Sequence, residues 1–324
     1  MPAVAGNAWA LAVGKQAAKG TAQTTPGAKL KYTGGFGPAP NRSIINLAET
    51  DASRQIGDPV VVGYRVQGSS EHYLRSVEFH KIADLLLGTT VSTGAGPYVH
   101  TASSPSSGTA GYATLYRALN STALVEQMID CQIVSMQIRG GTEQVLTYAC
   151  EWLGLSFVEG ATDPVLSVSN AAPLVYPHVT VTKAGSATAI VDSFELNINQ
   201  NRSLILGDTG LAASQIVAGQ YVVSGSLSLL FESDADYRTF HTGTAGGTTP
   251  TTTIASETLV LLAEANATTD SVTFDMDAIS ASTYEMTPNT DGAPLRATME
   301  FSSRRGATLA NVLEVITKNS VATV

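Results

Sequence analysis

The sequence predicts a mainly β protein, a β-sandwich or partial barrel flanked by short helices. Polar and apolar residues alternate with a period of two in many short stretches, as in Leu227, Leu229 and Phe231 between Ser226, Ser228 and Leu230, which is typical of strands with one buried face. Segments rich in Gly, Thr and Pro separate these stretches. Few stretches carry apolar residues at helical spacing, so we expect only a few short helices, which flank the strands.

Composition narrows the class of protein. The chain has 324 residues, of which 44% are hydrophobic and only 14% charged, against about 25% charged in ordinary soluble domains. A low charged fraction is typical of a protein whose surface is largely covered by partners, and it also fits a secreted β protein. The net charge of −9 argues against tight nucleic-acid binding, because basic side chains must displace phosphate counterions.

The distribution of apolar and basic residues bears on where the protein is expected to be located. No run of about 18 apolar residues indicates a membrane-spanning helix, and Lys15 and Lys19 follow the weakly apolar N-terminal stretch instead of preceding it, unlike a secretory signal. We therefore expect assembly in a cytosol, without a membrane.

The first half begins with the alternating run Trp9–Val13 and a polar arm that ends in GGFGPAP. Pro59–Gly68 is a predicted strand that leads into a helix, in which Leu74, Val77, Ile82, Leu85 and Leu86 recur at helical spacing before Gly88. Gly88 fits the left-handed residue that ends many helices. The Gly/Ser/Thr/Pro-rich stretch 90–111 is predicted as a long loop.

A hairpin is predicted next, with Asp130–Arg139 paired to Thr142–Leu153 about a Gly140-Gly141 turn. In that register Cys131 and Cys150 face each other across the strands. Two reduced core residues are the favoured interpretation, because cytosolic thiols stay reduced; a disulfide is the alternative.

The second half follows a looser composition after Gly160. Strands are predicted at His178–Lys183, Ala189–Gln200 and Gln220–Glu232, and Ile198 and Tyr221 are expected at the ends of a long hairpin with a projecting tip. Ser233 precedes Asp236 at capping spacing, which predicts a helix ending at Gly243. A Thr-rich loop, strands near Val272–Asp277, Thr283–Thr287 and Leu295–Ser302, and a terminal helix Thr308–Lys318 complete the chain.

The two halves share a theme of strand, helix and Gly/Thr-rich loop. Gly63 and Gly219 are offset by 156 residues, and Gly88 and Gly243 by 155. An internal duplication is therefore expected, with an N-terminal arm (1–40), a first fold (41–165) and a second fold (166–324).

Catalytic and metal-binding patterns are missing from the sequence. The histidines show no metal-ligand spacing, and neither a GxSxG nucleophile turn nor a GxxxxGK[ST] phosphate loop occurs. The five histidines of the chain are His72, His80, His100, His178 and His241. Asp270, Asp275 and Asp277 could hold a cation, but a polar strand face is the favoured interpretation because the calcium-loop glycine and distal Glu are lacking. We expect no enzyme and no cofactor.

Four stretches resemble the major tail tube proteins of bacteriophages with long, non-contractile tails. They are GKQAAKGTA (Gly14–Ala22), SRQIGDPVVVGYRVQG (Ser53–Gly68), DLLLGT (Asp84–Thr89) and VAGQYVVSGSLSLLFES (Val217–Ser233). The resemblance implies a structural virion protein that self-assembles into stacked rings, in which inner strands join into one β-barrel around a lumen for DNA ejection. It also implies contacts with tape measure, tail terminator and tail-tip proteins, and assembly in the host bacterial cytoplasm.

The resemblance also assigns roles to residues of this chain. The expected lumen face consists of Glu195, Asn197, Asn199, Ser224, Ser226, Ser228 and Glu232, a set without Lys or Arg through which double-stranded DNA passes without specific binding. The expected ring-stacking loop contains Asn201, Arg202, Asp208 and Thr209, with Ile44–Asp58 as its counterpart. In many members a single fold is shorter and six copies form a ring. This chain has 324 residues, and the offset of 155–156 residues between its halves favours two folds per chain. Three chains in a pseudo-sixfold ring are therefore favoured, and six chains are the alternative.

The alternative function is that of a β-rich adhesin, a carbohydrate-binding protein or a virion decoration protein. Such a protein predicts exposed aromatic platforms, whereas aromatic residues make up only 6% of this chain. Those present mostly occupy positions expected to face the core.

Overall fold

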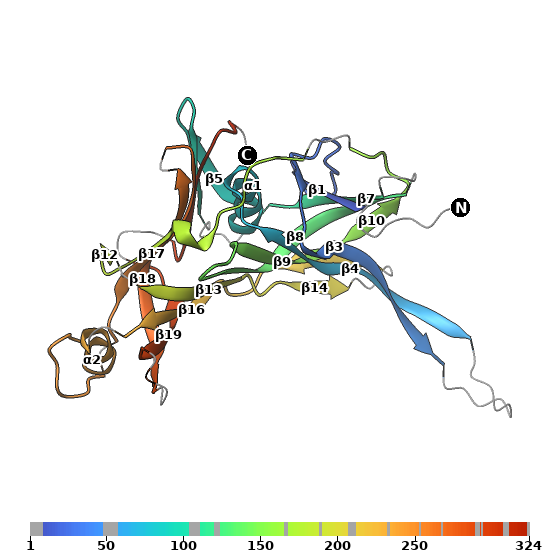
Figure 1. Cartoon of the computed structure of the whole chain (residues 1–324). Coiled ribbons are helices and arrows are strands. Elements are labelled where there is room, and N and C mark those ends of the chain that lie inside the picture. The colour runs from blue at the N-terminus through green and yellow to red at the C-terminus, as the bar shows by residue number, and fades with distance from the viewer. Residues whose placement is uncertain are drawn as a thin grey trace.

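The computed structural model of the chain is mainly β, as predicted, with two short α-helices (Figure 1). It describes residues 9–47, 58–103, 111–119, 124–164, 168–187, 190–206, 212–231, 234–252, 254–266, 268–288, 292, 294–306 and 311–322. All strand pairs within its named elements are antiparallel.

One eight-stranded sheet organises the molecule. Its spatial order is β3 (Gly34–Asn46), β4 (Pro59–Tyr73), β9 (Thr147–Gly154), β8 (Val125–Gly141), β13 (Val191–Asn199), β16 (Val222–Leu230), β19 (Arg296–Ser303) and β18 (Asp270–Thr287). The long hairpin of β3 and β4 extends from one end of the molecule, and β18, β19 and α2 lie at the other (Figure 1).

Two long strands leave this sheet and continue into other layers. The N-terminal part of β8 pairs with β7 (Ala113–Leu119) and β10 (Ser156–Glu159). The N-terminal part of β18 likewise pairs with β17 (Glu257–Asn266) and β20 (Glu314–Asn319). The remaining layers are built by pairing β1 (Trp9–Lys15) with β7 and with β2 (Ala28–Leu30), and β11 (Val179–Lys183) with β17 and with β12 (Ser186–Ala187).

The helices are placed as predicted. α1 (Ser76–Leu87) ends at Gly88, whose φ of 90° is left-handed and whose N–H donates to Asp84 O. Phe79 of α1 packs edge-on against Tyr148 and Phe274, so this helix is central to the core. α2 (Ala235–Thr242) ends at the left-handed Gly243 and has no fully buried residue. Ser233, the expected N-cap, lies outside the described residues.

The same strand arrangement occurs twice along the chain. In each half a hairpin (β3–β4, β13–β16) is followed by a helix and a second hairpin (β8–β9, β18–β19), and β4 pairs with β9 as β16 pairs with β19. The β8–β9 pairing has a bulge between Ile133 and Ser135, and the β18–β19 pairing has one between Ala281 and Thr283. The register and its irregularity are therefore repeated.

Glycines stand at matching close approaches in the two halves. Gly68 lies opposite Trp152, and Gly225 lies opposite Phe301. A Cβ on Gly68 would lie 2.6 Å from the carbonyl oxygen of Gly37, and a Cβ on Gly225 would lie 2.4 Å from that of Glu195. Both strands need glycine here because a neighbouring backbone fills the space that a side chain would take.

The predicted Asp130–Arg139/Thr142–Leu153 hairpin exists, but its predicted register is wrong. The turn is wider than Gly140-Gly141, and the bulge in β8 shifts the pairing further. As a result Cys150 lies opposite Met136, and Cys131 lies opposite Ala113. Both thiols are buried and free, which agrees with the favoured reduced state.

Two other segments differ from their predictions. Within the predicted loop 90–111, Thr89–Thr93 (β5) and Tyr98–Ser103 (β6) form a hairpin whose turn contains the positive-φ residues Gly94 and Gly96. The described part of the predicted helix Thr308–Lys318, from residue 311 onward, is not helical but leads into strand β20, since Leu313, Val315 and Thr317 are buried at every second position between β18 and β6; its first three residues lie outside the described residues.

Strands occur in the segment expected as an N-terminal arm and in the hairpin tip expected to project. Residues 9–40, expected as an arm, contain β1, β2 and the start of β3. The tip of the β13–β16 hairpin, expected to project, forms β14 (Ser203–Leu206) and β15 (Ala213–Val217). Ala213 and Ile216 of β15 are buried with Leu155, so this tip packs on the first half of the chain.

We predict that Gly225→Ala lowers the free energy of unfolding by about 1–3 kcal/mol, the usual cost of overpacking. The new methyl group would meet both Glu195 O and the Phe301 ring. Urea denaturation of the variant measures the loss. Gly246→Ala is the control, because a Cβ there meets nothing within 4 Å; equal stability of both variants would contradict the prediction.

The native protein should react slowly with a thiol reagent, and two thiols should appear once it is unfolded. Burial raises the pKa of both Cys131 and Cys150, so little reactive thiolate forms. Timed labelling with and without guanidinium checks this expectation. An intact mass that is 2 Da too low, as a disulfide requires, would oppose it.

Candidate functional site

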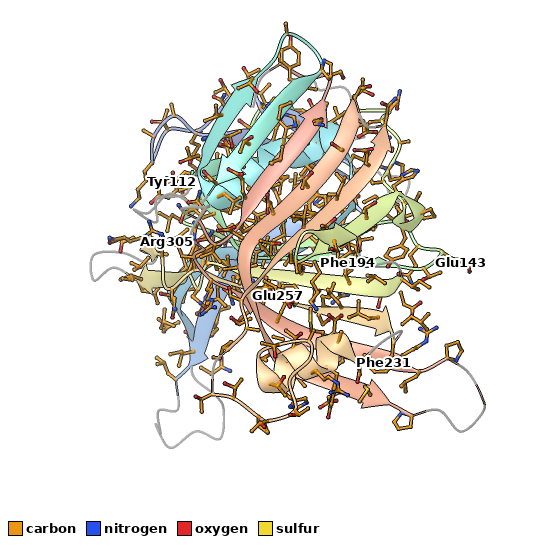
Figure 2. The ribbon with its side chains drawn as sticks, turned by 90° about the vertical axis from the view of Figure 1, so that its left-hand side faces the viewer. Tyr112, Glu143, Phe194, Phe231, Glu257 and Arg305 are labelled. Atoms are coloured by element: carbon orange, nitrogen blue, oxygen red, sulfur yellow. The ribbon has the colours of Figure 1, made fainter. Side chains whose placement is uncertain are left out.

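One face of the eight-stranded sheet is polar across its width, and we call it the polar face. Side chains alternate between the two faces of a strand, so its members occupy every second position while Phe194, Leu196 and Ile198 on the other face are buried. Figure 2 shows Phe194 inside the molecule and Glu143 at its margin. Tyr73, Ala149 and Leu153 share this face, and its polar residues are Arg65, Gln67, Ser69, Glu71, Ser135, Gln137, Arg139, Thr147, Glu151, Ser193, Glu195, Asn197, Asn199, Ser224, Ser226, Ser228, Thr283, Glu285, Arg296, Thr298, Glu300 and Ser302.

Six residues expected on the lumen face lie together on the polar face. Glu195 is opposite Ser226, Asn197 is opposite Ser224, and Ser228 is opposite Ser193. Asn199 ends the β13 row and is exposed. The seventh expected residue, Glu232, lies outside the described residues.

The Glu195 carboxylate is the best-connected acidic group of this row. Its Oε1 accepts hydrogen bonds from Gln137 Nε2 at 2.7 Å and Asn197 Nδ2 at 2.8 Å. Its Oε2 lies 3.5 Å from Arg139 Nε in an exposed ion pair. Sequence reasoning missed Arg139, because β13 lies beside β8 only through a pairing between segments more than 50 residues apart.

Acidic groups outnumber basic ones among the described polar-face residues. The carboxylates are those of Glu71, Glu151, Glu195, Glu285 and Glu300, and the guanidinium groups are those of Arg65, Arg139 and Arg296. Arg139 pairs with Glu195, and Arg296 pairs with Asp192. Most of the basic charge on this face is thereby compensated.

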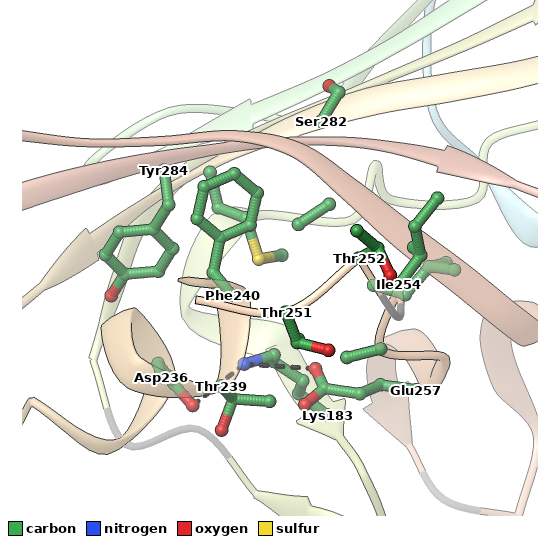
Figure 3. A pocket seen from close by; sticks show the side chains of 14 residues that line it. Lys183, Asp236, Thr239, Phe240, Thr251, Thr252, Ile254, Glu257, Ser282 and Tyr284 are labelled. Atoms are coloured by element: carbon green, nitrogen blue, oxygen red, sulfur yellow. Dashed lines mark ion pairs between the residues drawn. The ribbon is translucent and has the colours of Figure 1, made fainter. Parts of the chain in front are cut away.

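A second feature is a cavity of about 370 Å³ between α2 and the sheet (Figure 3). Lys183, only 8% exposed, places its Nζ 2.8 Å from Asp236 and 3.2 Å from Glu257. Phe240, Ile254 and Tyr284 supply apolar walls. The three charged groups satisfy one another, so the arrangement fastens α2 to β11 and β17.

In the part of the chain that is described, no three or more His, Cys, Asp or Glu side chains are grouped so that they could hold a metal ion. Burial lowers the pKa of His72 to about 4, and its Nδ1 lies 2.8 Å from the carbonyl oxygen of Lys31. His80 and His100 stack on each other, and Asn319 lies within hydrogen-bond distance of both rings. These contacts are those of structural side chains.

The expected ring-stacking residues are only partly described. Asn201 adopts a left-handed φ of 46°, and its Nδ2 donates to Gln220 O at 2.6 Å. Arg202 is buried, and burial lowers its pKa to about 10. Asp208 and Thr209 lie outside the described residues.

The β3–β4 hairpin carries apolar residues that the sequence analysis did not single out. Ile44, Ile45, Val60 and Val62 are exposed side chains on the part of this hairpin that extends from the body (Figure 1). Their signal was visible as the runs Ile44-Ile45 and Val60–Val62, which are unusual in a hairpin facing water on both sides. Exposed apolar residues gathered in one place mark contact surfaces.

A model of the family described as Phage tail tube protein matches residues 6–303 of the chain. A comparison of the chain with curated proteins found no match. Among the described residues, no helix has the length and apolarity needed to cross a membrane.

Lys183→Met should destabilise the protein by about 1–3 kcal/mol, because it removes charged hydrogen bonds and leaves Asp236 and Glu257 side by side without a cation. Urea denaturation measures the difference. Arg238→Met is the matched control, since it breaks an exposed ion pair between α2 and the preceding residue Asp234, worth about 0.5 kcal/mol. A loss at Lys183 no larger than this control would contradict the structural role.

Proposed function

The chain belongs to the phage tail tube protein family, so it is a structural protein of the virion tail, and we propose that its copies assemble into stacked rings that form the conduit for DNA ejection. The observation that carries this proposal is the eight-stranded sheet, polar on one face and unfinished at both ends. In the described part of the chain, β3 pairs only with β4, and Thr283–Thr287 pairs only with β19.

Unpaired strand edges favour association. Exposed N–H and C=O groups recruit another strand unless they are covered, and closure into a barrel removes every edge. The two free edges lie at opposite ends of the molecule (Figure 1). Head-to-tail contacts between identical chains close into rings when the rotation permits.

In this proposal the polar face lines the bore. Its carboxylates repel phosphate, and its arginines at positions 139 and 296 are held in ion pairs. A wall with little free positive charge gives a duplex no counterion-releasing grip. DNA would therefore pass with low friction whatever its sequence.

We further propose that each chain holds two tandem tube folds, so that three chains make a pseudo-sixfold ring. The repeated order, register and bulges support this division. The first fold then spans β1 to β10 and the second β11 to β20, which assigns part of the expected N-terminal arm to the first fold.

Ring stacking is proposed for the β3–β4 hairpin and for the loop that contains Asn201, Arg202, Asp208 and Thr209. The exposed Ile44, Ile45, Val60 and Val62 support the first of these. Tape measure, tail terminator and tail-tip proteins are the proposed partners at the tube's lumen and ends. Assembly is proposed to occur in the host bacterial cytoplasm.

The adhesin alternative has less support. Among the large hydrophobic side chains that are exposed in the described residues, Tyr73 is the only aromatic one. An aromatic sugar-binding platform needs several such rings together.

Purified protein should form annuli and hollow rods when concentrated, as seen by negative-stain electron microscopy. Top views should show an opening and six-fold features. Monomers at every concentration, or monomers that bind a glycan array, would count against the tube.

Reversing charge on the polar face should leave tubes intact but make them bind DNA. The variant carries Glu151→Lys, Glu195→Lys and Glu300→Lys, and cosedimentation with labelled duplex at low salt measures binding. The control tube carries Glu143→Lys, Glu159→Lys and Asp163→Lys at exposed positions outside the polar face. Equal DNA binding by both variant tubes would mean that the polar face does not line the bore.

A further inference from the structure

The junction between β8 and β13 lies inside one chain and joins its two repeated halves. We propose that the contact between neighbouring chains repeats this junction residue by residue, with β18 of one copy pairing antiparallel to β3 of the next. This inference rests on the proposed ring and specifies which strands meet and in which register.

The equivalence of β8 and β18 follows from their shared bulge. On β8, Ile133 pairs with Trp152 and Ser135 with Glu151. On β18, Ala281 pairs with Phe301 and Thr283 with Glu300. Even the side-chain contacts match, because Ser135 Oγ donates to Glu151 Oε2 at 2.7 Å and Thr283 Oγ1 donates to Glu300 Oε2 at 3.2 Å.

The bulge where β8 and β18 enter their second layers is repeated as well. Ala113 pairs with Cys131 and Leu115 with Met128; at the corresponding place, Glu257 pairs with Ile279 and Leu259 with Met276. Two independent bulges thus give the same alignment of β8 with β18.

The equivalence of β3 and β13 follows from their partner strands. Gly37 pairs with Ser69, which lies opposite Glu151. Glu195 pairs with Ser226, which lies opposite Glu300. Gly37 therefore corresponds to Glu195, and Ala39 corresponds to Asn197.

These equivalences fix the register between chains. Within the chain, Asn197 lies opposite Gln137, and Asn199 lies opposite Ser135. Between chains, Ala39 then lies opposite Glu285 and Asn41 lies opposite Thr283. The polar face would continue across the boundary, because all four residues have polar-face positions in their own strands.

Proline explains why this edge accepts one kind of partner. Gln200 N–H donates to Val134 O at 2.8 Å, and Thr142 N–H donates to Asp192 O at 2.9 Å, so by alternation Leu196 and Ile198 are the β13 residues that bond to β8. Their equivalents on β3 are Pro38 and Pro40. The free edge of β3 therefore offers carbonyl acceptors without N–H groups at these two positions, which suits the N–H groups of Tyr284 and Met286 on β18.

The same prolines discourage pairing of β3 with another β3. Proline on an edge strand removes donors and blunts non-specific pairing. The free edge of β3 therefore has fewer N–H donors for a second strand, while β18 keeps the N–H donors that β3 lacks at these positions. A head-to-tail pairing with β18 supplies N–H donors to these β3 carbonyls, whereas the β18 carbonyls opposite the two prolines receive no donor from β3.

The positions of the two helices support the proposed contact between chains independently of the strand registers. α1 contacts β18 and β20, which belong to the second half, and thus packs across the internal junction. α2, its counterpart, has no fully buried residue. On the first half, β10 is the counterpart of β20, and Val158 on it is 46% exposed. In the proposed contact, α2 of one copy lies near β10 of the next.

Disulfide trapping tests the register. Ala39→Cys with Glu285→Cys places one cysteine on each edge, at a non-hydrogen-bonded pair where Cα atoms lie about 4.5 Å apart, within the range of about 4.4–6.8 Å for a disulfide. The native Cys131 and Cys150 are fully buried and do not compete.

Two control variants accompany this pair. Asn197→Cys with Gln137→Cys is the same pair at the internal junction and should give an intrachain disulfide. Ser43→Cys with Glu285→Cys is displaced by four residues along β3, about 13 Å, and should not cross-link. Circular dichroism verifies that all variants are folded.

The expected result is a ladder on a non-reducing gel that ends at a covalent trimer for the Ala39/Glu285 variant alone, with rings retained in micrographs. Rings without this cross-link, while the internal control cross-links, would overturn the register and leave the proposed function standing. A ladder ending at six chains would overturn the three-chain ring. Wild-type protein that never forms rings would overturn the proposed function itself.

Discussion

The rest of this structure depends on the hydrogen-bonding requirement of strand edges. A sheet of eight antiparallel strands satisfies its inner backbone groups but, among the residues that the structure describes, leaves one row unpaired on β3 and another on the C-terminal part of β18. Such rows are tolerated in a stable protein when they are covered, bent or paired. Here they lie at opposite ends of the molecule (Figure 1). In the ring proposed above, a neighbouring copy of the chain completes the sheet.

The second constraint is that the sheet separates two environments. The face bearing Phe194, Leu196 and Ile198 packs into the core with α1, while the polar face holds carboxylates, amides and hydroxyls. Period-two alternation builds both faces from the same strands. Neutralising contacts such as Arg139 with Glu195 keep the polar face free of strong attraction for phosphate. The proposed bore depends on this polar wall as a whole more than on any single residue.

The two halves share their strand registers and differ in the helices and hairpins attached to them. α1 is buried in the core, and the β5–β6 hairpin that follows it is paired to β20. α2 is shorter and held by the Lys183 ion pairs. The extended β3–β4 hairpin has its counterpart in β13–β16, whose tip packs on the body. Strand register resists change because a shift of one residue turns every side chain to the opposite face, whereas loops and helices at the margin can diverge.

The sequence by itself determined the local features of this protein: the alternating faces of β13 and β16, the hairpin around Gly140, and both helix ends at Gly88 and Gly243. Each depends on residues within a few positions of one another. Only the tertiary structure decided the β8–β9 register, the strand at Glu314–Asn319 and the place of Arg139 beside Glu195. These depend on bulges and on partners far away in the chain, and packing against such partners outweighs local propensity. For the same reason the family was visible in short stretches of sequence, while the proposed contact between chains came from the strand registers.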